Sequence, residues 1–301
     1  MPDSPREFCR EACQQAGETI GGSAAASIPF IVALEHCKPW GSKAIPESDL
    51  PDEVKQVLDA VESTLEGARP QLIKREMSRT SRSRLMLAGI EPTVRRAVQW
   101  ELDDVRDLLA IDLVAAAQAL RDGETPEGSA AVDTPQLLVC TNGKRDRCCA
   151  KWGMPLFRIL SGIHTDTWET SHIGGHRFAP TLVWLQTGIC LGRIGPDEAV
   201  PMLAAIERGD IFRADRLRGR MSFSAPAQFA EAAWREETGR WDVAAITGAW
   251  SEATPQGHHA VTLRDDGGAE HRLTVRRRPL GILAAPSCDK QPEEVAVWER
   301  I

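Results

Sequence analysis

The chain has 301 residues, a net charge of −7 at pH 7 and a pI near 5.6, so nothing in its composition indicates a general nucleic-acid or anionic-membrane binder. Its longest apolar runs, Ala24–Leu34 and Ile111–Leu120, are shorter than the ~20 residues of a membrane helix, and the polar start Met1–Arg10 has no signal-peptide core. Eight unevenly placed cysteines do not form a secreted disulfide framework; we therefore expect a cytoplasmic protein whose clustered cysteines serve metal binding or redox chemistry.

The first part of the chain predicts an α/β layer fold in the order β-α-β-β-α. The apolar run Ile28–Leu34 predicts a buried strand, and Asp52–Leu65 has apolar residues at helical spacing. Gln71–Lys74 and Leu85–Ile90 are typical of strands, and Leu102–Leu120 predicts one long helix.

Arg121–Pro135 is rich in Pro, Gly and acidic residues and predicts an exposed linker. After it the order β-α-β-β-β-α fits a thioredoxin-like layer, so the two halves are expected to share an architecture. The predicted elements are a strand at Gln136–Val139, a helix at Cys149–Leu160, a strand at Thr167–Ser171, a hairpin of Thr181–Gln186 with Cys190–Arg193, and a helix at Pro196–Glu207.

The C-terminal part predicts a helix followed by strands. The helix is expected at Ala227–Glu237, and the strands at Trp241–Thr247, Ala260–Arg264 and His271–Arg277. We therefore divide the chain into an N-terminal α/β domain (residues 1–122), a linker (123–135), a thioredoxin-like domain (136–208) and a C-terminal α+β extension (209–301) packed on the second domain.

Two Cys/His segments lie in the second half. Cys140 ends a predicted strand, and the loop after it leads to Cys148 and Cys149 at a helix start, where backbone N–H groups lower thiol pKa values. About 22 residues later, His172 and His176 flank Gly174-Gly175, which favours a glycine loop over a helix. Two Cys and two His from two loops make a four-ligand metal site.

These ligand types fit two metals, a structural zinc and a Rieske-type [2Fe–2S] cluster, in which two His replace two Cys on one iron. Structural zinc sites usually use C-x2–4-C pairs because both ligands must reach one ion. Cys140 and Cys149 are separated by eight residues. This wide spacing favours the larger cluster and leaves zinc as the alternative.

The segments VCTNGKRDRCCA and TSHIGGHRFAPT resemble the sucrase/ferredoxin-like family, whose core is a thioredoxin-like [2Fe–2S] ferredoxin. The resemblance covers Gln136–Ile194, and more weakly Ala33–Ala44 and Arg218-Gly219-Arg220. Histidines stand where ordinary members have a second C-x3-C pair, as in the bis-histidine branch. The register of its R-D-x-x unit implies Cys149 as the second thiolate ligand, with Cys148 as the competitor.

The resemblance implies an electron carrier or reductase component with an unidentified redox protein partner. Neutral imidazoles raise the potential above that of an all-cysteine cluster, and an exposed ring nitrogen that loses its proton on oxidation makes the potential depend on pH. Arg145 and Arg177, close to the ligands in sequence, either offset cluster charge, dock an acidic partner or form surface salt bridges. No nucleotide-binding loop supports a self-contained reductase.

Other residues favour simpler interpretations. Cys9 and Cys13 are expected on a frayed or surface helix, Cys190 in the core, and Cys288 in a loop. Two further functions remain open at this point. One is a zinc-stabilised binding module, and the other is a thiol redox sensor that uses Cys148 and Cys149.

Overall fold

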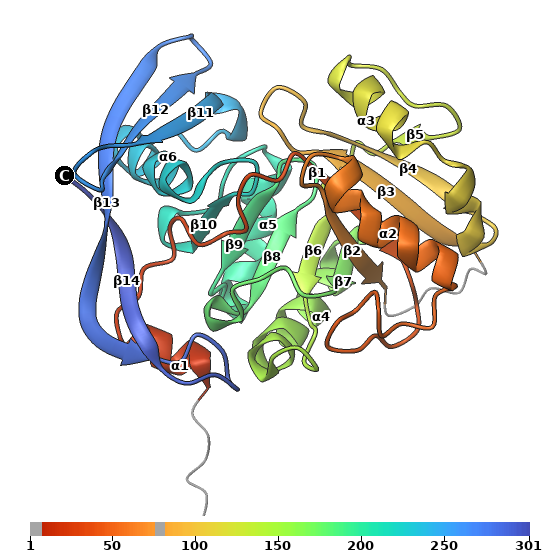
Figure 1. Ribbon diagram of the computed structural model, residues 1–301, viewed down its shortest axis with the longest axis horizontal. Coiled ribbons are helices and arrows are strands. Elements are labelled where there is room, and N and C mark those ends of the chain that lie inside the picture. Colours follow the sequence, from red (N-terminus) through yellow and green to blue (C-terminus); the bar gives the residue numbers. More distant parts are fainter. Residues whose placement is uncertain (1–7, 76–81) are drawn as a thin grey trace, which may run out of the picture.

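The structure is a computed structural model and describes residues 8–75 and 82–301. It is a mixed α/β fold with one ten-stranded and one four-stranded sheet (Figure 1). The α-helices are α1 (Cys9–Gln15), α2 (Asp52–Thr64), α3 (Leu113–Arg121), α4 (Met154–Ile163), α5 (Ala199–Glu207) and α6 (Ala225–Thr238). The strands of the large sheet are β1 (Phe30–Glu35), β2 (Arg69–Lys74), β3 (Ser83–Gly89), β4 (Arg96–Leu102), β5 (Ala130–Ala131), β6 (Leu137–Cys140), β7 (Thr167–Thr170), β8 (Thr181–Trp184), β9 (Ile189–Gly192) and β10 (Leu217–Arg220), and those of the small sheet are β11 (Ile246–Ala253), β12 (His259–Asp265), β13 (Glu270–Ala284) and β14 (Glu293–Arg300).

The large sheet contains the same strand arrangement twice. In the first half, β1 lies parallel to β2 and antiparallel to β3, which pairs with β4. In the second half, β6 lies parallel to β7 and antiparallel to β8, which pairs with β9. Helices α2 and α4 make the crossovers between the parallel strands of each half. The expectation that the two halves share a strand topology is therefore confirmed.

The two halves join edge to edge through β2 and β7, which are antiparallel with Ile73 opposite Thr170. Beyond β7, Ser171 continues this junction: its backbone N–H donates to the Leu72 carbonyl (2.8 Å), and its hydroxyl accepts from the Leu72 N–H (3.1 Å). The first half thereby holds the chain segment that leads directly to His172. The N-terminal half is part of what positions the histidine loop.

The hydrophobic pattern explains the central elements. All six residues of β1 are buried, as expected for a strand covered on both faces. In α2, Val54, Leu58 and Val61 recur at helical spacing and pack into the core under β1. The second half has its own core, in which α4 and α5 cover β6, β8 and β9.

The long helix predicted at Leu102–Leu120 is wrong. Residues 96–102 form strand β4, paired with β3, and a short 3-10 turn (Val105–Ala110) precedes α3. The reason is the two aspartates: Asp104 forms a capping box at the 3-10 turn, and the Asp112 carboxylate accepts from the N–H groups of Val114 and Ala115 at 3.0 Å. These caps begin separate helical segments within an apolar-rich stretch that hydrophobic periodicity alone predicts as a single helix.

The strand predicted at Trp241–Thr247 is also wrong at its start. The Asp242 side chain caps a 3-10 turn (Val243–Ala245), and β11 begins only at Ile246. The domain boundaries stay predictions. Within the predicted linker, β5 pairs with β4.

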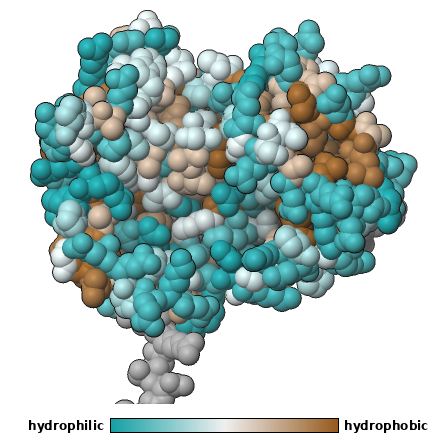
Figure 2. Space-filling model, in the orientation of Figure 1, coloured by the Kyte–Doolittle hydropathy of each residue, from teal (hydrophilic) through white to brown (hydrophobic). Residues whose placement is uncertain are grey.

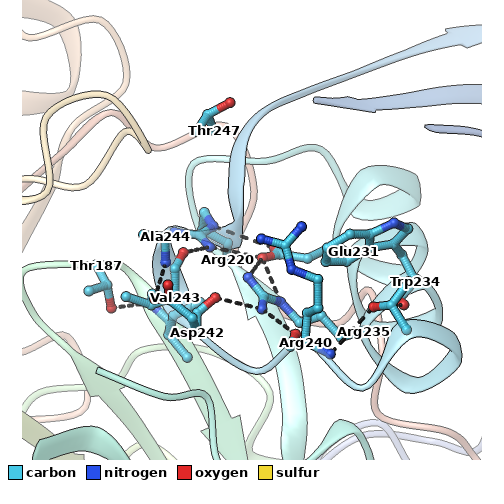
Figure 3. A network of polar contacts seen from close by, with 12 residues as sticks. Thr187, Arg220, Glu231, Trp234, Arg235, Arg240, Asp242, Val243, Ala244 and Thr247 are labelled. Carbon is cyan, nitrogen blue, oxygen red and sulfur yellow. Dashed lines mark hydrogen bonds and ion pairs between the residues drawn. The ribbon is translucent and has the colours of Figure 1, made fainter. Parts of the chain in front are cut away.

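The small sheet packs against α6, which also contacts β10 of the large sheet. A fully buried ion-pair network holds this region (Figure 3). Glu231 on α6 accepts from Arg220 Nη2 at 2.8 Å and from Arg235 Nη2 at 2.9 Å. Both guanidinium groups also donate to backbone carbonyls, Arg220 to Val243 and Arg235 to Asp242. The network therefore links β10, the edge strand of the large sheet, to the 3-10 turn that precedes β11 of the small sheet.

The surface in Figure 2 is mostly hydrophilic, with an apolar patch on the side of the molecule that carries α2 and α3. Exposed apolar side chains of that region include Leu109 and Val114. Among the residues described, no helix has both the length and the apolarity that crossing a bilayer requires.

Candidate metal centre

Three of the four predicted ligands meet where the parallel strands β6 and β7 end. Cys140 is the last residue of β6, Cys149 opens a short π-helix (Cys149–Gly153) that leads into α4, and His172 follows β7 by two residues. His172 Nδ1 lies 3.9 Å from Cys140 Sγ and 3.8 Å from Cys149 Sγ. All three candidate ligand atoms lie within 4.8 Å of one another. This group is able to hold a metal.

His176 lies beside this group. Its ring stacks on that of His172, with 5.0 Å between centroids. Its Nε2 lies 2.9 Å from the Pro286 carbonyl, so the ring proton on this side donates there and Nδ1 carries the lone pair. Burial lowers the pKa of His176, which keeps the ring neutral. His176 Nδ1 is buried without a hydrogen-bond partner among the described residues, which is what a missing metal contact would leave.

The two adjacent cysteines point to different places. Cys149 faces Cys140 and His172, whereas Cys148 Sγ lies 3.3 Å from Cys9 Sγ and 3.4 Å from Cys288 Sγ. The expectation of a frayed or surface helix for Cys9 and Cys13 is wrong, because both side chains are fully buried. Cys190 is in the core, and Cys288 is in a loop.

The two thiols of the first group shift each other's pKa in opposite directions. The Cys149 thiol donates to Cys140 Sγ, and together with His172 it lowers the pKa of the buried Cys140 thiol. The same hydrogen bond raises the pKa of Cys149. Both thiols must lose their protons to bind a metal.

Two arginines, the fully buried Arg218 and the half-buried Arg69, position the histidine loop. Arg218 Nη1 donates to the Gly174 carbonyl at 2.9 Å and lies 3.4 Å from Cys190 Sγ, and Arg69 Nη2 donates to the His172 carbonyl at 3.0 Å. The ligand motifs alone do not identify these arginines. In the sequence, only the weak family resemblance at Arg218-Gly219-Arg220 pointed to Arg218 as a functional residue. Nothing in the sequence pointed to Arg69.

A substitution at Gly175 tests whether Arg218 positions the histidine loop. Its φ of +67° suits glycine, and a Cβ there would lie 2.1 Å from Arg218 Nη2. Gly175→Ala is therefore expected to lose about 1–3 kcal/mol of stability to backbone strain and to displace Arg218 from the loop, with loss of metal from this centre. Thermal unfolding and metal content measure both effects.

Gly174→Ala is the matched control, since φ is +89° there but nothing lies within 4 Å of the added Cβ. It should show the strain without the displaced arginine, and so retain more metal. Equal metal loss in both variants would remove Arg218 from this role.

His172 also borders a cavity of about 700 Å³ between the two halves. Charged side chains of both signs line it: Lys43, Arg69 and Arg145 are basic, and Asp59 and Glu62 are acidic. Arg177 instead forms an ion pair with Glu18 at 2.9 Å. The two arginines near the ligands in sequence thus have different surroundings, and only Arg145 lies at this cavity.

The sucrase/ferredoxin-like family model matches residues 20–219, and the chain belongs to this family. This confirms the resemblance drawn from the Cys/His segments. The match includes all four predicted ligands and ends before Cys288, while Cys9 precedes it. No curated protein and no solved structure matches the chain.

Proposed function

We propose that this member of the sucrase/ferredoxin-like family is an electron-transfer protein that holds a [2Fe–2S] cluster through Cys140, Cys149, His172 and His176. The observation that carries the proposal is the buried, unpartnered Nδ1 of His176 beside the group of Cys140, Cys149 and His172. Two thiolates and two neutral imidazoles are the ligand set of a bis-histidine cluster. Electron transfer is the chemistry that such a cluster supplies when bound.

The strand order supports a thioredoxin-like unit in each half. Across the sheet, the four strands of each half lie in the order second, first, third, fourth. This order is β2-β1-β3-β4 in the first half and β7-β6-β8-β9 in the second half. We propose that the second unit carries the cluster. The cysteines are free of disulfides, which fits the reducing cytoplasm as its location.

The side chains around the site have separate tasks in this proposal. The thiolates anchor one side of the cluster, and the Pro286 carbonyl fixes the ring of His176 through Nε2. His172 borders the cavity lined by Lys43 and Arg145, which gives a redox partner a short path to the metal.

One observation favours zinc as a second candidate. The separations of 3.8 and 3.9 Å between His172 Nδ1 and the two sulfurs are close to the ~3.6 Å expected for ligands of one tetrahedral zinc ion. A two-iron cluster requires the histidines to lie farther from the thiolates. Cys148 and Cys149 face different groups, which argues against a thiol sensor that uses these two cysteines together.

Anaerobic purification followed by absorption spectroscopy and metal analysis decides between these candidates. The proposal expects reddish-brown protein with visible charge-transfer bands and equal amounts of iron and acid-labile sulfide, which dithionite bleaches reversibly. Colourless protein whose candidate centre holds zinc would refute the cluster and establish the binding module.

A further inference from the structure

Three cysteines that are far apart in the sequence meet outside the candidate centre described above. Cys9 comes from α1, Cys148 from the turn before the π-helix, and Cys288 from the loop between β13 and β14, which Figure 1 shows beside α1. Their sulfurs form a triangle with sides of 3.3 Å (Cys9–Cys148), 3.4 Å (Cys148–Cys288) and 3.7 Å (Cys9–Cys288). Cys9 and Cys148 are fully buried.

The carboxylate of Asp146 completes this group. Its Oδ1 lies 3.2 Å from Cys288 Sγ and 3.8 Å from Cys9 Sγ, and its side chain is fully buried. Backbone N–H groups hold it in place, that of Cys148 on Oδ1 (2.8 Å) and that of Cys288 on Oδ2 (2.9 Å). These contacts fix the Asp146 carboxylate as the fourth donor of the group.

We propose that Cys9, Cys148, Cys288 and Asp146 bind a second metal ion, a structural zinc. Sulfur ligands at the usual Zn–S distance of about 2.3 Å in a tetrahedron lie about 3.8 Å apart, and a sulfur and a carboxylate oxygen lie about 3.6 Å apart. The separations of 3.2–3.8 Å in this group need only small adjustments to reach those values. All four candidate ligand atoms lie within 4.8 Å of one another.

The chemistry of the donors selects the metal. Thiolates prefer zinc and other soft ions to Mg²⁺ or Ca²⁺, and a closed set of four protein ligands is typical of a structural zinc. Binding releases the thiol protons, and the divalent ion then offsets the negative charge of the thiolates and the Asp146 carboxylate. Without the ion the thiols keep their protons, and the Asp146 carboxylate is stabilised by the backbone N–H groups of Cys148 and Cys288 alone.

The position of this group suggests what the ion does. It joins α1, the loop of the candidate centre and the β13–β14 loop, three segments whose apolar residues Phe8, Trp152 and Ala285 also pack around the two buried cysteines. Pro286, two residues before Cys288, accepts from His176 Nε2, and Asp146 Oδ2 lies 3.6 Å from the same nitrogen. The zinc would therefore fix the loop that orients His176. Cys9 and Cys288 lie outside the residues that the family model matches, so the site is a feature of this chain beyond that match.

Metal analysis of the full chain, expressed with zinc in the medium, tests the proposal. About one zinc ion per chain is expected at this site, lost in Cys9→Ser and in Cys288→Ser. Cys13→Ser is the matched control, because Cys13 is a buried cysteine of the same helix that contacts Glu18 instead. It should keep the zinc.

Cobalt substitution in the wild-type chain guards against variants that fail to fold. Tetrahedral d–d bands and thiolate-to-cobalt charge transfer of three sulfurs are expected, and the charge transfer should weaken by about one third in Cys288→Ser. Absence of a second metal in the wild type would overturn the proposal, as would a disulfide between Cys9 and Cys148 found by thiol titration. The test of the zinc site is independent of the test of the [2Fe–2S] cluster, because Cys140→Ser should remove the metal of the first centre and leave the zinc bound.

Discussion

Cys149→Ser is expected to lose the metal of the candidate centre almost completely, whereas the neighbouring Cys148→Ser is expected to retain it. The reason is that Cys149 Sγ lies with Cys140 and His172, while Cys148 Sγ lies with Cys9 and Cys288. Loss of one of four ligands leaves the remaining three with an open coordination position and an exposed, labile metal. Iron, sulfide and zinc contents together with the visible spectrum measure the effect.

Cys148→Ser and Cys149→Ser serve as controls for each other, since the two substitutions are chemically identical and adjacent in the chain. Cys148→Ser should instead lose the proposed zinc and keep the visible bands. The reverse result, with the bands lost in Cys148→Ser and kept in Cys149→Ser, would contradict both site assignments together. A partial loss in Cys148→Ser would indicate that the zinc supports His176 through the Pro286 loop.

Glu231→Ala is expected to lower the free energy of unfolding by about 3–5 kcal/mol, a large part of the stability of an ordinary domain. The substitution leaves the buried guanidinium groups of Arg220 and Arg235 without their counter-charge. Urea unfolding of the purified chain measures the change. Glu237→Ala on the same helix is the matched control, because its pair with Arg300 is half exposed and contributes about 1 kcal/mol or less.

Acid should weaken the same network. Burial raises the pKa of Glu231, but Arg220 and Arg235 outweigh it and hold the folded pKa below the ordinary value of 4.5. The stabilisation is therefore present above pH 4.5 and is lost as the pH falls through the folded pKa. Equal destabilisation by Glu231→Ala and Glu237→Ala would show that the buried ion pairs of Glu231 contribute no more to the free energy of unfolding than the exposed pair of Glu237.

Local sequence patterns predicted most of the core elements. The apolar runs at β1 and β6, the crossover helix α2 and the hairpin of β8 and β9 all lie close to the predicted positions. The errors fall where a side-chain cap interrupts an apolar-rich window, as at Asp104, Asp112 and Asp242. Strand β14 was missed altogether, and it exists as a partner of β13.

The sequence by itself determined the α/β class, the family and a Cys/His site around Cys140, because residue types and spacing are local properties that one stretch of chain carries. Only the tertiary structure decided the junction of β2 with β7, the arginines that hold the histidine loop, and the meeting of Cys9, Cys148 and Cys288. The cysteines of that group stand 139 and 140 positions apart. Such contacts depend on how whole elements pack, and no periodicity within one segment encodes them. The preference for Cys149 over Cys148, a matter of motif register in the sequence, corresponds in the structure to two thiols that face separate groups.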